Sequence, residues 1–263
     1  MTPTQFTEFM EQGVVTIDTP LQPEEIAAAS DALERLAPFI SPDAPDQPRY
    51  RTGASCFEPA LLDIVQHPFF EETAKRALNA DAVRLFQTVA IIAYPQPDTP
   101  FSFDQHVDIQ YCLSDFESTP RRIVCSFFLW LSDVNERRAP MMFRPGSHLL
   151  LAKENERRGA GAGEVRTVKG AMLEQLPALD YAPPIPITAR AGQVSVLTTS
   201  AVHGGSTNMD DASRKAMIIT FAAAGVEIGL PPEQAEQKRD CDRALRPLLR
   251  PERRHIVEVE TAN

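Results

Sequence analysis

The chain has few cysteines and no long uninterrupted apolar run, the features that mark disulfide-rich, zinc-binding and membrane-spanning proteins. Its 263 residues contain only four cysteines, which are scattered and include no Cys-x-x-Cys pair. Neither a zinc knuckle nor a disulfide framework is therefore suggested. The apolar run that begins at Ile123, IVCSFFLWL, is too short and too interrupted to cross a bilayer. We expect no membrane-embedded part.

Basic charge is scarce relative to acidic charge. The chain has 26 Lys and Arg against 36 Asp and Glu, which gives a formal net charge of −10. Because this charge opposes the neutralisation of phosphates, we expect neither a nucleic acid nor an anionic membrane as partner. The opening MTPTQFTEFMEQG carries acids and no apolar signal segment. We expect a reduced, cytoplasmic setting and a monomer or homodimer.

Residues 1–82 show mainly helical patterns. The segment TPTQFTEFMEQG offers an N-cap threonine, an apolar face and a terminating Gly13. Three further helices are predicted in LQPEEIAAASDALERLAPF, EPALLDIVQ and PFFEETAKRALNA, each with proline near its start. The Pro- and Asp-rich connector at residues 41–55 predicts no regular structure. We expect this part to support a core formed by the rest of the chain.

Residues 83–224 are rich in apolar runs with β-branched residues, separated by Pro, Gly, Asn and Asp. Six or more strands with no long helices between most of them indicate an antiparallel sandwich or jelly roll. Residues 150–184 interrupt the strands with a glycine-rich GAGAG centre and a predicted short helix in KGAMLEQLPAL, and we expect this insertion to act as a lid. Residues 225–263 predict a charged helical tail packed outside. The whole chain, 1–263, is predicted to form one domain.

The stretch FDQHVDIQ carries a candidate pair of metal ligands. On a strand, His106 and Asp108 project to the same side and lie about 6–7 Å apart along the chain. A mononuclear oxygenase iron takes two imidazoles and one carboxylate and keeps its opposite face open. His203, at a strand end beside glycines in TTSAVHGGSTN, is the candidate for the second imidazole.

Arg214 opens the strand RKAMIITFAA, eleven residues after His203. It shares one face of that strand with Ala216, Ile218 and Thr220, so we expect its guanidinium among small and apolar side chains. A buried arginine is costly unless an anion pairs with it. Because a guanidinium binds a carboxylate through two hydrogen bonds, a bound dicarboxylic acid would account for Arg214.

Three other polar side chains are expected to have structural roles. His148, in RPGSHLL, is expected to hydrogen-bond backbone rather than to bind metal. His67 precedes Pro68 and is expected to cap a helix or lie on the surface. Arg144 is expected to pair with Asp133 or another acid.

The ordered set His106, Asp108, His203 and Arg214 resembles the phytanoyl-CoA dioxygenase family. The segments LSDVNERRAPMMFRPGSH and QFTEFMEQGVVTI are also similar to that family, and the likeness runs over about residues 5–224. The resemblance implies a mainly β, double-stranded β-helix core of the jelly-roll or cupin-like kind with supporting N-terminal helices. It also implies iron(II) bound by the two histidines and Asp108, 2-oxoglutarate bound by Arg214, O2 as oxidant and ascorbate in support.

Some positions depart from the family pattern. Gly205 stands where relatives often have the serine of His-x-Ser, and Ser206 follows it. Ser126 lies where relatives carry a hydroxyl, so we predict Ser126 and Ser206 as further contacts of 2-oxoglutarate. Asp108 fills the carboxylate position that related halogenases leave to a small residue, so the resemblance implies hydroxylation rather than halogenation.

The predicted function is a dioxygenase that hydroxylates a small-molecule metabolite. Desaturation, ring formation and endoperoxide formation stay open. Two other classes are also open: a zinc-dependent hydrolase or isomerase that uses the same three ligands, and a non-catalytic jelly-roll binding protein. The acidity of the chain favours a natural-product or amine-bearing substrate over a highly anionic one such as a coenzyme A thioester.

Overall fold

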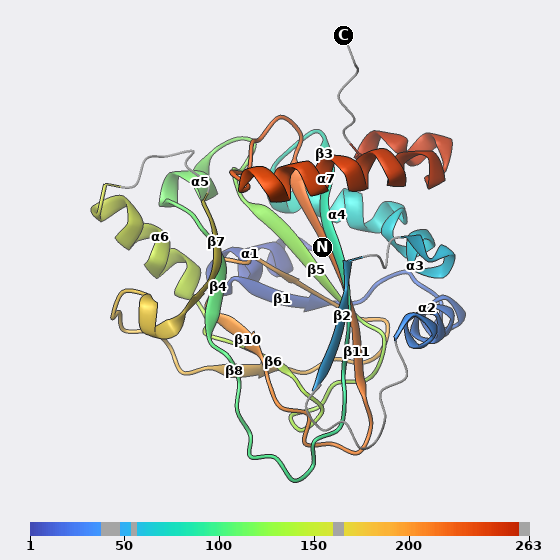
Figure 1. Ribbon diagram of the computed structural model, residues 1–263. Coiled ribbons are helices and arrows are strands. Elements are labelled where there is room, and N and C mark those ends of the chain that lie inside the picture. The colour runs from blue at the N-terminus through green and yellow to red at the C-terminus, as the bar shows by residue number, and fades with distance from the viewer. Residues whose placement is uncertain (38–47, 54–56, 160–165, 258–263) are drawn as a thin grey trace.

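Two antiparallel sheets form the core of the computed structural model, which describes residues 1–37, 48–53, 57–159 and 166–257 (Figure 1). The larger sheet has six strands, in the order β1 (Val14–Ile17), β9 (Val194–Leu197), β5 (Val124–Trp130), β11 (Arg214–Ala223), β3 (Val83–Ala93) and β2 (Arg49–Thr52). The smaller sheet has five, in the order β7 (Arg166–Met172), β4 (His106–Gln110), β10 (His203–Gly205), β6 (Met141–Phe143) and β8 (Ile185–Ile187). The predicted mainly β jelly roll with supporting helices is confirmed.

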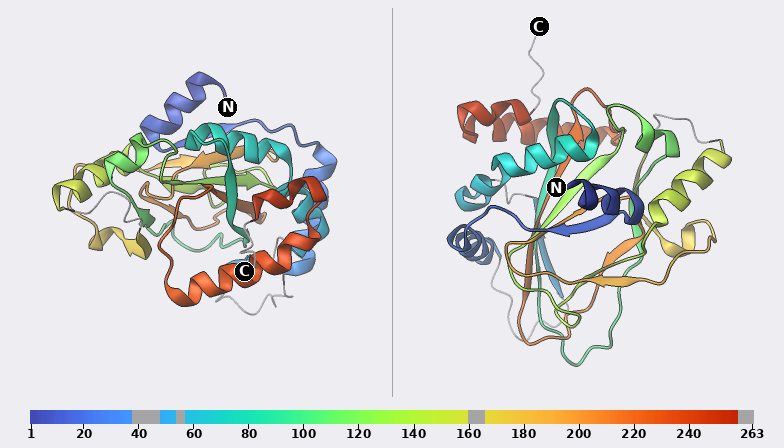
Figure 2. Two further views of the ribbon diagram at one scale, coloured as in Figure 1. Left: turned by 90° about the horizontal axis from the view of Figure 1, so that it is seen from above. Right: turned by 180° about the vertical axis from the view of Figure 1, so that it is seen from behind.

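Helices surround this core (Figure 2). They are α1 (Pro3–Gln12), α2 (Pro23–Leu36), α3 (Pro59–Val65), α4 (Pro68–Leu78), α5 (Leu113–Glu117), α6 (Ser147–Arg157) and α7 (Pro232–Leu245), with 3-10 turns at Leu173–Gln175, Arg246–Leu248 and Pro251–Ile256. The four helices predicted before residue 83 and the helical tail are therefore present. No helix in the described ranges is long and apolar enough to cross a membrane.

The central strands of the larger sheet are buried on both faces. Helix α4 packs on β5 and β11, where the ring of Phe70 meets the ring of Phe127 edge-on with centroids 5.5 Å apart. Because side chains alternate along a strand, Ser126 and Phe128 point to the opposite face, toward the smaller sheet. The helices thus cover one face of the sheet and leave the other face to form a cavity.

The N-terminal helix begins and ends as its sequence predicts. Thr2 and Gln5 form a capping box, in which the Thr2 amide donates to Gln5 Oε1 at 2.8 Å and the Gln5 amide donates to Thr2 Oγ1 at 3.3 Å. Gly13 ends the helix with φ +86°, in the left-handed region that glycine tolerates. The chain then enters β1 directly, which pairs with β9.

His148 packs against this turn, as the sequence suggested. Its ring is buried, and Nε2 lies 3.0 Å from the carbonyl oxygen of Met10. Burial lowers the pKa of His148 to about 4, so the ring is neutral at neutral pH and donates from Nε2. His67 also has the expected role, because its Nδ1 accepts from the amide of Phe69 at the start of α4.

Three local expectations were wrong. The connector at residues 41–55 includes β2, whose backbone pairs with β3 although its side chains are polar. The predicted helix in KGAMLEQLPAL begins instead as the end of β7, which pairs with β4, and only Leu173–Gln175 is helical. Arg144 forms no ion pair with an acid among the described residues: it donates to Gln105 Oε1 at 2.7 Å and to the carbonyl oxygen of Ala182 at 2.9 Å.

The insertion at residues 150–184 contributes the end of α6 as well as β7. Its glycine-rich centre falls mostly within residues 160–165, outside the described residues. Cys56 also lies outside the described residues. The lid role of this insertion therefore stays a prediction.

Gly13→Ala should destabilise the fold, because a Cβ at this position would be strained by the positive φ and would lie 2.7 Å from Nδ1 of His148. Strain of this kind costs about 1–3 kcal/mol in free energy of unfolding, and the close contact adds to it. Gly225→Ala is the matched control, since Gly225 has φ +77° but no atom within 4 Å of its Cβ position. Urea denaturation in which both variants lose equal stability would contradict the contact with His148.

Candidate metal centre

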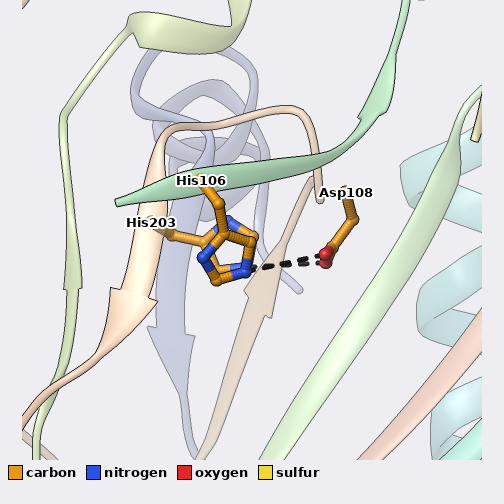
Figure 3. Close-up of side chains that lie close together, drawn as sticks. All are labelled: His106, Asp108 and His203. Carbon is orange, nitrogen blue, oxygen red and sulfur yellow. Dashed lines mark ion pairs between the residues drawn. The ribbon is translucent and has the colours of Figure 1, made fainter. Parts of the chain in front are cut away.

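The pairing of two short strands brings the predicted ligands together (Figure 3). His203 of β10 lies directly opposite His106 of β4 in the antiparallel register, and the ring centroids are 4.6 Å apart. Asp108, two residues along β4, lies on the same side. Its carboxylate oxygens are 3.6 Å from Nε2 of His106 and 3.6 Å from Nε2 of His203.

These three side chains offer ligand atoms that all lie within 4.8 Å of one another. That spacing is on the scale set by metal–ligand bonds of about 2.0–2.2 Å, so small side-chain rotations would let all three reach one cation. Among the described residues, no other group of three or more His, Cys, Asp or Glu side chains meets this criterion. Burial and then the nearby His203 lower the pKa of His106, which keeps its imidazole available as a neutral ligand.

The backbone around β10 orients the distal histidine. Nδ1 of His203 lies 2.8 Å from the carbonyl oxygen of Ala201, which fixes the proton on Nδ1 and leaves the Nε2 lone pair facing Asp108. The next residue, Gly204, is crossed closely by the chain before β4: a Cβ on Gly204 would lie 1.3 Å from the carbonyl oxygen of Asp104. Glycine at this position is therefore required for β4 and β10 to approach.

A cavity of about 540 Å³ opens beside the three ligands. Both sheets line it, with side chains of β5, β11 and β3 on one side and of β4 and β10 on the other. Its apolar lining consists of Phe86, Ile91, Ile109, Val124, Phe128, Met141, Ile218, Leu230 and Pro231. No described residue of the 150–184 insertion lines it. The cavity can thus hold a small molecule next to a bound metal ion.

Arg214 enters this cavity from the start of β11, on the face that the sequence predicted. Only 3% of its surface is exposed, and it lies over the ring of Trp130 at 5.7 Å from the centroid. Nε donates to the carbonyl oxygen of Ala139 at 3.3 Å, whereas Nη1 is buried and has no hydrogen-bond partner among the described residues. Burial, followed by the charges of Arg49 and Arg51, lowers the pKa of Arg214 to about 9, so the group stays cationic at neutral pH. An orphaned buried cation of this kind fits a missing carboxylate.

The two predicted serines lie in different surroundings. Ser126 lines the cavity, and its hydroxyl lies 2.9 Å from that of Thr220 on the paired strand β11. Ser206 is buried and donates to the carbonyl oxygen of Pro140 at 2.6 Å, outside the cavity lining. A direct contact from Ser206 to a ligand stays a prediction, and its observed bond holds the chain after β10 in place.

Several cavity residues were not anticipated from the sequence. Arg49 and Arg51 of β2 line it, as do Gln87 of β3 and Gln234 of α7. The alternation Arg-Tyr-Arg in RYRT was the available signal for β2, but the prolines before it hid the strand. The tail likewise takes part in the cavity through Gln234 and the two residues before α7, which the expectation of external packing did not include.

Two imidazoles and a carboxylate on paired jelly-roll strands, beside a cavity with a buried arginine, form a site that could hold one metal ion with an anionic small molecule beside it. The chain belongs to the phytanoyl-CoA dioxygenase family, whose model matches residues 9–216. This family consists of enzymes that use iron(II), 2-oxoglutarate and O2. The resemblance drawn from the motifs is thereby confirmed.

Solved structures show the same fold. The carbocyclase SnoK from nogalamycin biosynthesis, described as non-haem and α-ketoglutarate-dependent, is 21% identical with a TM-score of 0.65, and the match covers 90% of each chain. The epimerase SnoN, solved with Fe3+, α-ketoglutarate and nogalamycin RO, is 17% identical with a TM-score of 0.62, over 84% of this chain and 83% of that one. HygX from Streptomyces hygroscopicus, with nickel and 2-oxoglutarate bound, is 15% identical with a TM-score of 0.59, over 86% and 88%. No curated protein matches the chain.

Replacing any one of the three predicted ligands should remove metal binding. His106→Ala, Asp108→Ala and His203→Ala each leave two ligands, which are too few for a stable facial site. We expect metal content after loading with iron(II) under anaerobic conditions to fall to background in each variant, while circular dichroism shows an intact fold. His148→Ala is the control and should keep its metal. A His148→Ala variant without metal beside a His203→Ala variant with metal would mean that the ligand set is wrong.

Proposed function

We propose that this protein is an iron(II)- and 2-oxoglutarate-dependent dioxygenase that oxidises a small molecule. The observation that carries the proposal is the buried Nη1 of Arg214, which has no hydrogen-bond partner in the described part of the chain and lies in the same cavity as His106, Asp108 and His203. A metal site alone would fit several chemistries. A metal site beside a buried, uncompensated guanidinium fits one in which a carboxylate co-substrate binds next to the metal.

The chain's own residues have separate tasks in this proposal. His106, Asp108 and His203 would hold the iron, and Arg214 would bind the distal carboxylate of 2-oxoglutarate, with the Ser126 hydroxyl beside it. When bound, iron(II) with 2-oxoglutarate and O2 supplies an oxidant that can take hydrogen from an unactivated carbon. The apolar walls, which include Phe128, limit the water that reaches this oxidant.

We further propose hydroxylation as the reaction, because Asp108 occupies the carboxylate position and leaves no place for a halide. The substrate's placement in the cavity would decide between hydroxylation and the desaturation, cyclisation or epimerisation outcomes that the same oxidant permits. A single domain is also proposed for the chain, since the described N-terminal helices pack on the core and residues around the start of α7 line the cavity.

Two other functions predict different measurements. A zinc hydrolase or isomerase on the same ligands would need no carboxylate co-substrate and gives no reason for the buried Arg214. A non-catalytic binding protein would bind 2-oxoglutarate without consuming it. Turnover of 2-oxoglutarate to succinate with iron(II), and its absence with zinc, would exclude both alternatives.

Arg214→Lys should weaken binding of 2-oxoglutarate although the charge is kept. A compact ammonium cannot reproduce the two parallel hydrogen bonds of a guanidinium, and loss of a charged hydrogen bond costs about 1.5–3 kcal/mol. Titration of 2-oxoglutarate into the nickel(II)-loaded protein should therefore show an increase in Kd of about tenfold or more. Arg190→Lys, an exposed site paired with Asp18, is the control and should bind as the unmodified protein does. Equal affinity in the two variants would show that another residue holds the distal carboxylate.

A further inference from the structure

Strand β2 presents two arginines to the cavity. Because side chains alternate, Arg49 and Arg51 lie on one face of β2 and Tyr50 lies on the other, where its hydroxyl donates to the carbonyl oxygen of Leu36 at 2.9 Å. The pairing with β3 fixes this orientation: Arg49 lies opposite Ala93 and Arg51 opposite Ile91. Ile91 itself lines the cavity, so the arginine face of β2 continues the cavity wall.

The guanidinium of Arg49 forms hydrogen bonds to the backbone of the protein. Its Nη2 donates to the carbonyl oxygen of Gly205 at 2.6 Å and to that of Ser206 at 3.1 Å, which ties β2 to the end of β10. The absence of a side chain on Gly205 makes room for it, since a Cβ there would lie 3.1 Å from the guanidinium carbon. Arg49 on β2 and Arg214 on β11 are both register partners of Ala93 on β3, which lies between these two strands.

Arg51 differs from both of these arginines. It lines the same cavity, yet its side chain is exposed and makes no hydrogen bond or ion pair with any described residue. A long, unpaired guanidinium at a cavity wall is free to bind an incoming group. Its five donors suit the oxygens of a carboxylate or a phosphate, and it has no acceptor capacity for an amine.

The net charge of the site with iron(II) and 2-oxoglutarate bound also favours an anionic group on the substrate. The charges of iron(II) and 2-oxoglutarate would cancel, and the positive charge of Arg214 would balance the negative charge of Asp108. Asp108 is the only carboxylate among the described cavity-lining residues. Arg49 and Arg51 then remain as two positive charges. Burial lowers the pKa of Arg49, and the charge of Asp104, just outside the lining, opposes this shift and offsets one of the two positive charges. One positive charge faces the space left for substrate, although the whole chain is acidic.

We propose that the substrate is an apolar molecule with one anionic group, a carboxylate or a phosphate, and that Arg51 binds this group. The apolar wall that includes Phe86, Phe128 and Leu230 would hold the body of the molecule. The inference rests on the proposed function, because it assigns the remaining part of the same cavity. It replaces the expectation of an amine-bearing substrate, which was drawn from the net charge of the whole chain and took no account of where the arginines lie.

Matched probes test this assignment without turnover. Phenylbutyrate, phenylbutyl phosphate and the neutral phenylbutyramide share one apolar body, and octanoate, octyl phosphate and octanamide form a second set. Each is titrated calorimetrically into full-length protein loaded with nickel(II) and saturating 2-oxoglutarate, with retention of 2-oxoglutarate followed in the same samples. We expect at least one anion to bind about tenfold or more tightly than its amide, the scale of one charged hydrogen bond.

Arg51→Gln should abolish this preference and leave the affinity for the amide unchanged. Arg190→Gln removes the same charge from an exposed position outside the cavity and should keep the preference. The proposal is overturned if no anion is preferred by the unmodified protein, if the preference survives in Arg51→Gln, or if the anions bind only by displacing 2-oxoglutarate. Whether carboxylates or phosphates gain more identifies the anionic group.

Failure of the proposed function would look different. A protein that binds no 2-oxoglutarate contradicts the dioxygenase assignment, and the same probe titrations on the metal-free protein then show whether Arg51 still selects anions. A protein that binds 2-oxoglutarate normally but treats anions and amides alike retains the dioxygenase assignment and refutes the role of Arg51.

Discussion

The antiparallel pairing of β10 with β4 is the constraint on which the rest of the site depends. It places His203 directly opposite His106, and the two-residue period of β4 then brings Asp108 to the same side. This pairing requires a close approach of two backbones, which Gly204 permits because it has no side chain to meet the carbonyl group of Asp104. The loop before β10 completes this arrangement, because the carbonyl oxygen of Ala201 lies 2.8 Å from Nδ1 of His203 and that of Thr199 accepts from the amide of Asp108 at 3.0 Å.

The larger sheet holds a charged side chain, Arg214, inside the protein. Its central strands carry apolar side chains to the helices on one face, as at Phe127, and a mixed set to the cavity on the other. Arg214 lies on the cavity face over Trp130, with Nε bound to the backbone carbonyl of Ala139 and Nη1 without a partner among the described residues. The energetic cost of such a buried cation would fall if an anion bound beside it.

Segments far from the metal ligands in sequence complete the cavity. The edge strand β2 contributes Arg49 and Arg51. The segment around the start of α7 contributes Leu230, Pro231 and Gln234. The candidate metal ligands and Arg214 thus lie on the core strands, whereas peripheral elements supply other parts of the cavity wall. Peripheral segments of this kind can differ between proteins of one fold without disturbing the core strands that carry the candidate ligands.

Much of this protein follows from its sequence. Local signals determined the capped helix before Gly13 and the strand alternation that puts Arg214 on the cavity face, because capping and side-chain period act over a few residues. The order His106, Asp108, His203 and Arg214 determined the family. Only the tertiary structure decided the surroundings of Arg51 and the hydrogen bond from Ser206 to Pro140, because edge-strand pairing and bonds to distant carbonyl groups join residues whose separation no local pattern encodes. The net charge of −10 does not show where the charges lie, because folding alone places three arginines around one cavity.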